Sequence, residues 1–151
     1  METKIETNLE ALNRIQKELK APKWQTSEFG KYKYRSCEDI LEAVKPLLGN
    51  FTLLISDDIV LVGDRYYVKA TATYGGISVS AFARETIEKK GMDTAQITGA
   101  TSSYARKYAL NGLFAIDDTK DADSTNTHGK EEKKQDGKTF DKTMDVISFE
   151  D

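Results

Sequence analysis

The amino-acid sequence predicts an α+β domain in which a three-stranded antiparallel β meander packs on one long helix. Apolar and polar residues alternate, as in half-buried strands, over three segments: 51–62, 65–74 and 77–85. Glycine-containing turns of the hairpin type separate them at Gly63-Asp64 and Gly75-Gly76. A helix start signal follows at Asp93, where Gln96 completes a capping box. This β-β-β-α order, with helices before it and a disordered tail after it, is the predicted fold.

Two helices are expected ahead of the meander. Residues 3–20 place apolar side chains at intervals of three and four, which predicts an amphipathic helix; they are Ile5, Leu9, Leu12, Ile15 and Leu19. This apolar face either packs in the core or forms a subunit interface. Ser36, with Asp39 at the third position, caps a second helix of about 12 residues. Pro46 is expected to loosen its last turn before Gly49.

The meander carries one irregularity and one clear pattern. Asp57-Asp58 interrupts an apolar run and predicts a bulge or a bend in the first strand. The second strand separates an apolar face from a polar one. The apolar face holds Tyr66, Val68, Ala70 and Ala72, and the polar face holds Arg65, Tyr67, Lys69 and Thr71. We therefore expect one face of the sheet to be covered and the other to meet solvent.

Small residues at helical spacing follow Asp93 and predict close approach of another backbone; they are Ala95, Gly99, Ser102 or Ser103, and Ala109. Because Gly inside a helix costs about 1 kcal/mol relative to Ala, Gly99 suggests a packing requirement. Asn111-Gly112 is expected to end the helix, since both residues tolerate the left-handed conformation. Tyr104 and Tyr108, four residues apart, are expected in the core.

Composition indicates a soluble protein of the cytoplasm. No apolar run approaches the length of a membrane span, and no secretory signal pattern stands at the N-terminus. Cys37 is the only cysteine, which excludes a disulfide framework within the chain. Residues 1–118 hold 16 basic and 16 acidic side chains, whereas residues 119–151 hold 6 and 9. The net charge of −3 therefore lies in the tail, and it does not exclude nucleic acid as a partner.

The first candidate contact with DNA is the segment 31–35, where cations alternate with rings: Lys31, Tyr32, Lys33, Tyr34 and Arg35. In an extended conformation the three cations lie on one side and the two rings on the other. Proteins that bind single strands combine cations, which follow phosphates, with rings on which bases stack. The alternative is an edge strand whose tyrosines fill the core and whose lysines are solvated.

Further cations form two more candidates. Arg106 and Lys107 point about 100° apart on the long helix. One can follow the DNA backbone, whereas Arg106 can alternatively form a salt bridge with the acidic cluster Asp117–Asp123. The remaining candidates, which would line a groove between sheet and helix if they cluster in space, are Arg65, Lys69, Arg84, Lys89 and Lys90. Individually, each is most often a solvated residue.

Motifs for chemistry are not found. The sequence contains no phosphate-binding G-x-x-x-x-G-K-[ST] loop, and its one histidine, His128, lies in the tail. Asp121, Asp123 and Glu132 fit an EF-hand loop poorly, because Asn126 stands where glycine is required. We therefore expect no enzyme activity, no metal site and no cofactor.

Two separated motifs together resemble the Erf (essential recombination function) family of phage single-strand annealing proteins. Met92, Asp93, Ala95, Gln96 and Gly99 lead into Tyr104-Ala-Arg-Lys-Tyr108 and then into an acidic run, and Gly30-Lys-Tyr-Lys-Tyr-Arg35 precedes them. The resemblance covers residues 1–123 and implies ATP-independent annealing of single-stranded DNA by a homo-oligomer, as a ring or a filament. It also implies the host cytoplasm as the location.

The tail, residues 124–151, has the composition of a flexible acidic linker. Its tip, Asp145–Asp151, regains apolar residues and is a candidate docking peptide for a single-stranded-DNA-binding protein or another recombination factor. The alternative is an unstructured end. Two rival functions stay open: a non-annealing protector of single strands, and a regulatory module that acts through this tail.

Overall fold

The computed structural model describes residues 2–116, which form one unit within Met1–Asp117. The element order is α1 (Asn8–Glu18), β1 (Gln25–Thr26), β2 (Lys33–Tyr34), α2 (Cys37–Val44), η1 (Lys45–Leu47), β3 (Leu53–Val62), β4 (Arg65–Tyr74), β5 (Ile77–Arg84) and α3 (Thr94–Phe114). The predicted β-β-β-α order is thus confirmed. The tail and the predicted boundary at residue 123 lie outside the described residues. None of the helices within 2–116 is long and apolar enough to span a membrane.

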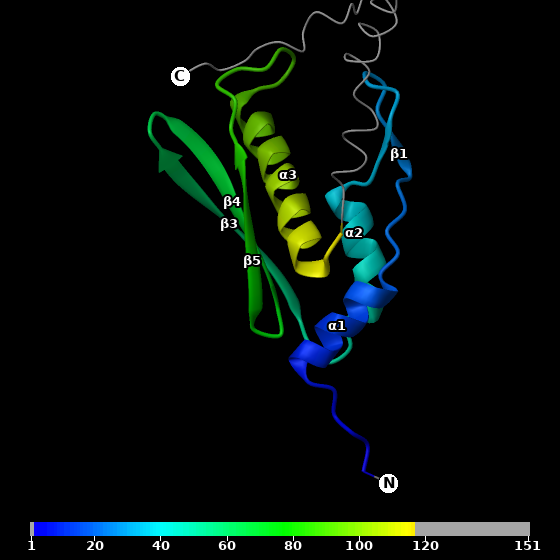
Figure 1. The fold of residues 1–151 in the computed structure, drawn as a ribbon. Coiled ribbons are helices and arrows are strands. Elements are labelled where there is room, and N and C mark those ends of the chain that lie inside the picture. Colours follow the sequence, from blue (N-terminus) through cyan, green and yellow to red (C-terminus); the bar gives the residue numbers. More distant parts are fainter. Residues whose placement is uncertain (1, 117–151) are drawn as a thin grey trace, which may run out of the picture. The chain divides into compact units, whose positions relative to one another are not determined.

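The main sheet has the strand order β3-β4-β5, and both neighbouring pairs are antiparallel. The expected bulge at Asp57-Asp58 is wrong, because β3 and β4 pair without interruption from Leu53↔Tyr74 to Val62↔Arg65. Asp57 instead interrupts the apolar pattern because it lies on the covered face and bonds to α3. In Figure 1, α3 lies across one face of this sheet, with α1 and α2 beyond it.

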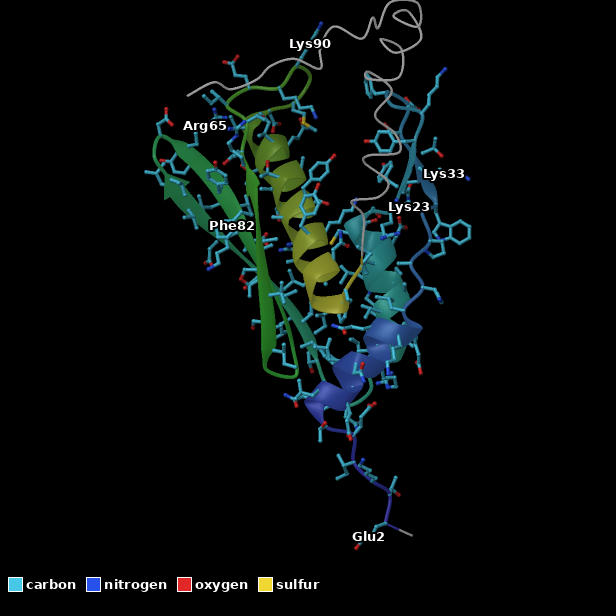
Figure 2. All side chains as sticks on the ribbon, viewed as in Figure 1. Glu2, Lys23, Lys33, Arg65, Phe82 and Lys90 are labelled. Carbon is cyan, nitrogen blue, oxygen red and sulfur yellow. The ribbon has the colours of Figure 1, made fainter. Side chains whose placement is uncertain are left out.

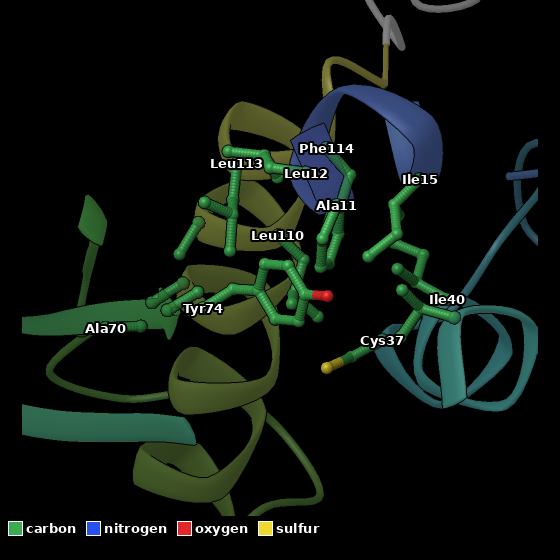
Figure 3. Close-up of a cluster of buried hydrophobic side chains, with 14 of the residues drawn as sticks. Ala11, Leu12, Ile15, Cys37, Ile40, Ala70, Tyr74, Leu110, Leu113 and Phe114 are labelled. Atoms are coloured by element: carbon green, nitrogen blue, oxygen red, sulfur yellow. The ribbon is translucent and has the colours of Figure 1, made fainter. Parts of the chain in front are cut away.

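Small side chains allow α3 to approach the sheet closely. Ala105 and Ala109 of α3 and Ala70 and Ala72 of β4 are fully buried. Gly112 is held against β5, since a Cβ built on it would lie 2.8 Å from Val79 Cγ1. The large side chains of the core gather instead where α1 and α2 meet α3 (Figure 3).

Tyr74 lies at the centre of this core and is fully buried. Its ring makes edge contacts with Phe51 at 5.7 Å and with Phe114 at 6.4 Å between centroids. Its hydroxyl donates a hydrogen bond of 2.5 Å to the Leu48 carbonyl, which satisfies the polar end of an otherwise apolar environment. Such aromatic pairs contribute about 0.5–1.5 kcal/mol beyond the area that they bury.

The helix start signals are confirmed, and some of the expected helix bounds are wrong. Ser36 with Asp39, and Asp93 with Gln96, each form a complete capping box. The first helix begins at Asn8, not near residue 3, because Thr7 and Glu10 form a third box. Of its predicted apolar face, Leu12 and Ile15 are buried and Leu19 is partly buried, whereas Ile5 and Leu9 are exposed.

The end of α3 also differs from the prediction. The helix continues through Asn111 and Gly112 and ends at Phe114, where Ala115 adopts the left-handed conformation. Asn111 is buried, so this residue serves packing and not termination. Pro46 lies in the 3-10 turn η1 that follows α2, so the expected loosening of the end of that helix is confirmed.

Candidate nucleic-acid interface

The sequence-predicted cations and rings lie on two separate surfaces. The segment Lys31–Arg35 contains β2 of the β1–β2 hairpin, and Lys107 of α3 lies against Tyr34 of that hairpin, whereas Arg106 pairs with Asp57 of β3. Arg65, Lys69 and Arg84 lie on the sheet face that points away from α3, as the strand alternation requires. Figure 2 shows Lys33 and Phe82 on opposite sides of α3. The expected groove between sheet and helix is therefore wrong for these three cations.

Only part of the segment 31–35 is a strand. Lys33 and Tyr34 form β2 and pair with β1, while Lys31 stands in the connecting loop with a φ of 49°. The Lys31 amide donates to the Ser27 carbonyl, and the Ser27 amide donates to the Tyr32 carbonyl. These bonds close a tight loop that presents the lysines to solvent. The expected alternation of three cations along one extended strand is thus replaced by a hairpin.

A close contact accounts for the glycine at the start of the motif Gly30–Arg35. A Cβ at this position would lie 2.3 Å from two carbon atoms of the Tyr32 ring, so no other residue fits without displacing that ring. The Tyr32 and Tyr34 rings then lie 6.0 Å apart at 59°. Neither tyrosine belongs to the buried core, which argues against the alternative in which they fill it.

Lys107 joins the two motifs. Its Nζ lies 5.9 Å from the centre of the Tyr34 ring, which is within the range of a cation–π contact. Tyr104 and Tyr108 flank it on α3 and are 57% and 49% exposed, so their expected place in the core is wrong. We call the set Lys31, Tyr32, Lys33, Tyr34, Tyr104, Lys107 and Tyr108 the basic–aromatic surface. Within it, Lys33 lies on the other side of β2 from Tyr34 and points away from α3 (Figure 2).

Arg106 and Arg35 are both partly buried. Arg106 Nε lies 3.0 Å from Asp57 Oδ1, and the Ser102 hydroxyl donates to the same carboxylate. Arg106 thus forms a salt bridge, but with Asp57, which the sequence did not indicate as its partner. The predicted partners Asp117–Asp123 lie outside the described residues. Arg35 is partly buried and lines a pocket with the end of α3.

The electrostatics around Asp57 follow from this pairing. Burial by itself raises the pKa of the Asp57 carboxyl, but the hydrogen bonds from Arg106 and Ser102 and the charge of Arg106 outweigh it and lower the pKa. The same hydrogen bond raises the pKa of Arg106. Burial raises the pKa of the Cys37 thiol nearby, which is consistent with a packing role.

The uncovered sheet face gathers a second set of cations and rings, which we call the outer sheet face: Arg65, Tyr67, Lys69, Phe82 and Arg84. Lys69 stands opposite Phe82 in the strand register, with its Nζ 5.8 Å from the ring centre, and Tyr67 stands opposite Arg84. Sequence reasoning missed Phe82, which is 52% exposed. Its position among the polar residues of an alternating strand was the pattern that could have indicated an exposed ring. Lys89 and Lys90 lie in the loop that leads from β5 to α3.

Within the described residues, no three His, Cys, Asp or Glu side chains gather as metal ligands would. The arrangement consists of cations beside exposed rings on two faces. Cations beside exposed rings are the combination with which proteins that bind single-stranded nucleic acid follow phosphates and stack on bases.

Comparison with known proteins gives the family. A family model described as the ERF superfamily matches residues 9–146, and the chain therefore belongs to this superfamily. It is similar to the "Essential recombination function protein" of Salmonella phage P22, with 69% identity over 117 residues. The match covers 75% of this chain and 57% of that protein, so the chain spans little more than half of its relative's length. No solved structure matches the chain.

Proposed function

We propose that this chain binds single-stranded DNA and anneals complementary strands during phage recombination, without ATP. The proposal rests on membership of the ERF superfamily and on the name of the P22 relative, which places that protein in recombination. The observation that carries it is the contact between Lys107 and Tyr34, because it unites two motifs far apart in the sequence on one basic–aromatic surface.

The chemistry of this surface suits one strand and leaves its bases accessible. Lysine ammonium groups attract phosphates at any sequence, and exposed tyrosine rings stack on bases, each contributing about 1–3 kcal/mol. A strand held in this way can still pair with its complement. Base pairing itself then drives the product, so the proposed mechanism needs no bond chemistry and no nucleotide.

The outer sheet face is a second candidate contact for DNA, favoured by the Lys69–Phe82 pair. It repeats the combination of cation and exposed ring on the opposite side of α3. Its contribution can be measured separately, since no residue belongs to both surfaces.

The test follows the annealing of two complementary labelled oligonucleotides at moderate salt without ATP. We compare wild type with Lys33→Gln/Lys107→Gln, and with the control Lys17→Gln/Lys45→Gln, which removes the same charge from α1 and from η1 after α2. Wild type and control should accelerate annealing strongly, and the Lys33/Lys107 variant should not. Its binding should also depend less on salt. The slope of log K against log salt should be shallower by about 1.4, because each lost phosphate contact with a single strand removes about 0.7.

Other outcomes separate the rival functions. Tight binding by wild type without faster annealing would favour a protector of single strands. A wild type that does not bind DNA would leave the regulatory module, for which deletion of residues 124–151 should abolish function. Equal loss of annealing in both lysine variants would show that total charge matters and that the basic–aromatic surface is not the site.

A further inference from the structure

The β1–β2 hairpin carries two large aromatic side chains that the rest of the described chain leaves uncovered. Phe29, in the loop between the strands, is fully exposed, and Trp24, directly before β1, is 74% exposed. By contrast, Tyr32 is 39% exposed and Tyr34 is partly buried, with their rings 6.0 Å apart. The two open rings therefore lie outside the segment 31–35 that the sequence indicated, and they belong to neither surface described above.

One side of this hairpin is anchored on the helices. Gln25 stands opposite Tyr34 in the strand register, so the two side chains share a side. There Lys107 of α3 lies over the Tyr34 ring, and the Gln25 side-chain amide donates a hydrogen bond to the Asp39 carboxylate of α2. These contacts support a hairpin that would be marginal by itself, because each of its strands has two residues.

The opposite side of the hairpin brings an open ring and a cation together. Thr26 and Lys33 form the next pair in the register and lie on this side, because neighbouring residues of a strand point to opposite sides. Figure 2 shows Lys33 turned away from α3. Trp24 stands two residues before Thr26, so the same alternation of an extended chain places it on the side of Lys33.

The loop presents the second ring. The Ser27 amide and carbonyl bond to Tyr32 and Lys31, and the Gly30 amide donates to the Ser27 hydroxyl, so the turn is closed from within. Phe29 stands in the middle of this turn and is not covered by it. We call Trp24, Phe29, Lys31 and Lys33 the hairpin site.

The charge around the hairpin site favours an anionic partner. Residues 20–35 contain five cations, Lys20, Lys23, Lys31, Lys33 and Arg35, and a single acid, Glu28. Residues 1–118 as a whole hold equal numbers of basic and acidic side chains, so this excess is local. The partner therefore combines negative charge with flat apolar groups for the two rings. A single DNA strand has both, whereas a duplex hides the faces of its bases in the stack.

We propose that Trp24 and Phe29 stack on bases of a single DNA strand whose phosphates Lys31 and Lys33 hold. This inference rests on the proposed binding of single-stranded DNA and adds two stacking residues to it. A stacking ring contacts the flat face of a base and leaves the pairing edge open, so the site is compatible with annealing. Because the faces of bases are covered in a duplex, the same rings favour single strands over duplexes.

The first test uses the fluorescence of Trp24, the only tryptophan of the chain. The full chain is titrated with a thymidine oligonucleotide and with an abasic oligonucleotide of equal length, which has the same phosphates and no bases. A base that stacks on the indole ring quenches its fluorescence. The thymidine oligonucleotide should therefore quench Trp24 and the abasic one should not, at concentrations where the anisotropy of end-labelled copies shows both to be bound.

The second test compares variants by the same anisotropy measurement, after circular dichroism verifies that they are folded. Trp24→Ala and Phe29→Ala should each weaken binding of the thymidine oligonucleotide about tenfold and leave binding of the abasic one unchanged, since each removes one stacking ring. Lys33→Gln should weaken both alike, because the phosphates are common to both. Tyr66→Ala is the control, since it removes a ring that is 53% exposed and belongs to none of the named surfaces; it should change neither affinity.

The remaining outcomes overturn the proposal in distinguishable ways. Binding of the thymidine oligonucleotide without quenching of Trp24, or with wild-type affinity in both ring variants, would exclude stacking at the hairpin site and leave the proposed function intact. Equal loss of affinity for the two oligonucleotides in the ring variants would show a structural role for these rings. A wild type that binds neither oligonucleotide would overturn this proposal together with the proposed function.

Discussion

Two glycines inside α3 have opposite surroundings and therefore give a quantitative test of its packing. Gly99 and Gly112 both lie within Thr94–Phe114. A Cβ at Gly99 would meet no atom within 4 Å, so the packing requirement expected at this position is not found within the described chain. A Cβ at Gly112 would lie 2.8 Å from Val79 Cγ1, which is closer than two carbon atoms can approach.

The same substitution should thus change stability in opposite directions. Gly99→Ala should stabilise the fold by about 0.5–1 kcal/mol, because alanine loses less backbone entropy in a helix. Gly112→Ala has the same gain, but overpacking against the stiff, β-branched Val79 costs about 1–3 kcal/mol. The two variants should therefore differ by about 1–3 kcal/mol in the free energy of unfolding.

Urea unfolding, followed by circular dichroism at one protein concentration, measures this difference. Val79→Ala removes the clashing methyl group, so Gly112→Ala should cost less in the Val79→Ala background, with a coupling of about 1 kcal/mol or more. Equal stability of the two glycine variants, or a double-mutant cycle without coupling, would refute the close approach of α3 to β5.

Three further predictions concern Asp57, the central tyrosine and the outer sheet face. Because the pKa of Asp57 is lowered, its pairing with Arg106 stabilises the fold fully above the ordinary Asp value of 3.8 and is lost as the pH falls through the folded value. The difference in unfolding free energy between wild type and Asp57→Asn should therefore shrink from pH 7 to pH 3, and a constant difference would contradict the pairing. Tyr74→Phe should cost about 0.5–1.5 kcal/mol in urea unfolding, since the Leu48 carbonyl then keeps only its longer bond of 3.4 Å from the Phe51 amide, and an unchanged midpoint would show that the hydroxyl bond is dispensable. Phe82→Ala should weaken binding of single-stranded DNA about tenfold, in line with the loss of one stacking ring, while Leu54→Ala on the same face should not; equal affinities would exclude the outer sheet face as a contact.

Local signals in the sequence determine most of the fold. The alternation and the glycine turns place the three strands within two residues of their bounds, because both depend on neighbours in the chain. The same holds for the capping boxes at Ser36 and Asp93, where the side chain and the amide that it accepts from are three residues apart. The site is less predictable, since it depends on which face of each element is covered.

Tyr104 and Asp57 show what such patterns leave out. The spacing of Tyr104 and Tyr108 shows that they share a helix face, but not that the sheet covers the neighbouring face. The sheet selects Ala105 and Ala109, because small side chains allow the closest approach. Asp57 looks like an irregularity in a strand until α3 supplies Arg106, 49 residues away in the sequence. Contacts over such separations have no local signature.

The same limit explains why exposed apolar residues are informative in this chain. The periodicity of the sequence shows how long an amphipathic face is. The structure shows how much of that length the core covers. The two lengths agree for most of α1 and for the first half of β3, and they disagree at Ile5, Leu9, Ile59 and Leu61. Isolated exposed apolar residues are common, but residues that continue a buried face in register are not explained by chance exposure.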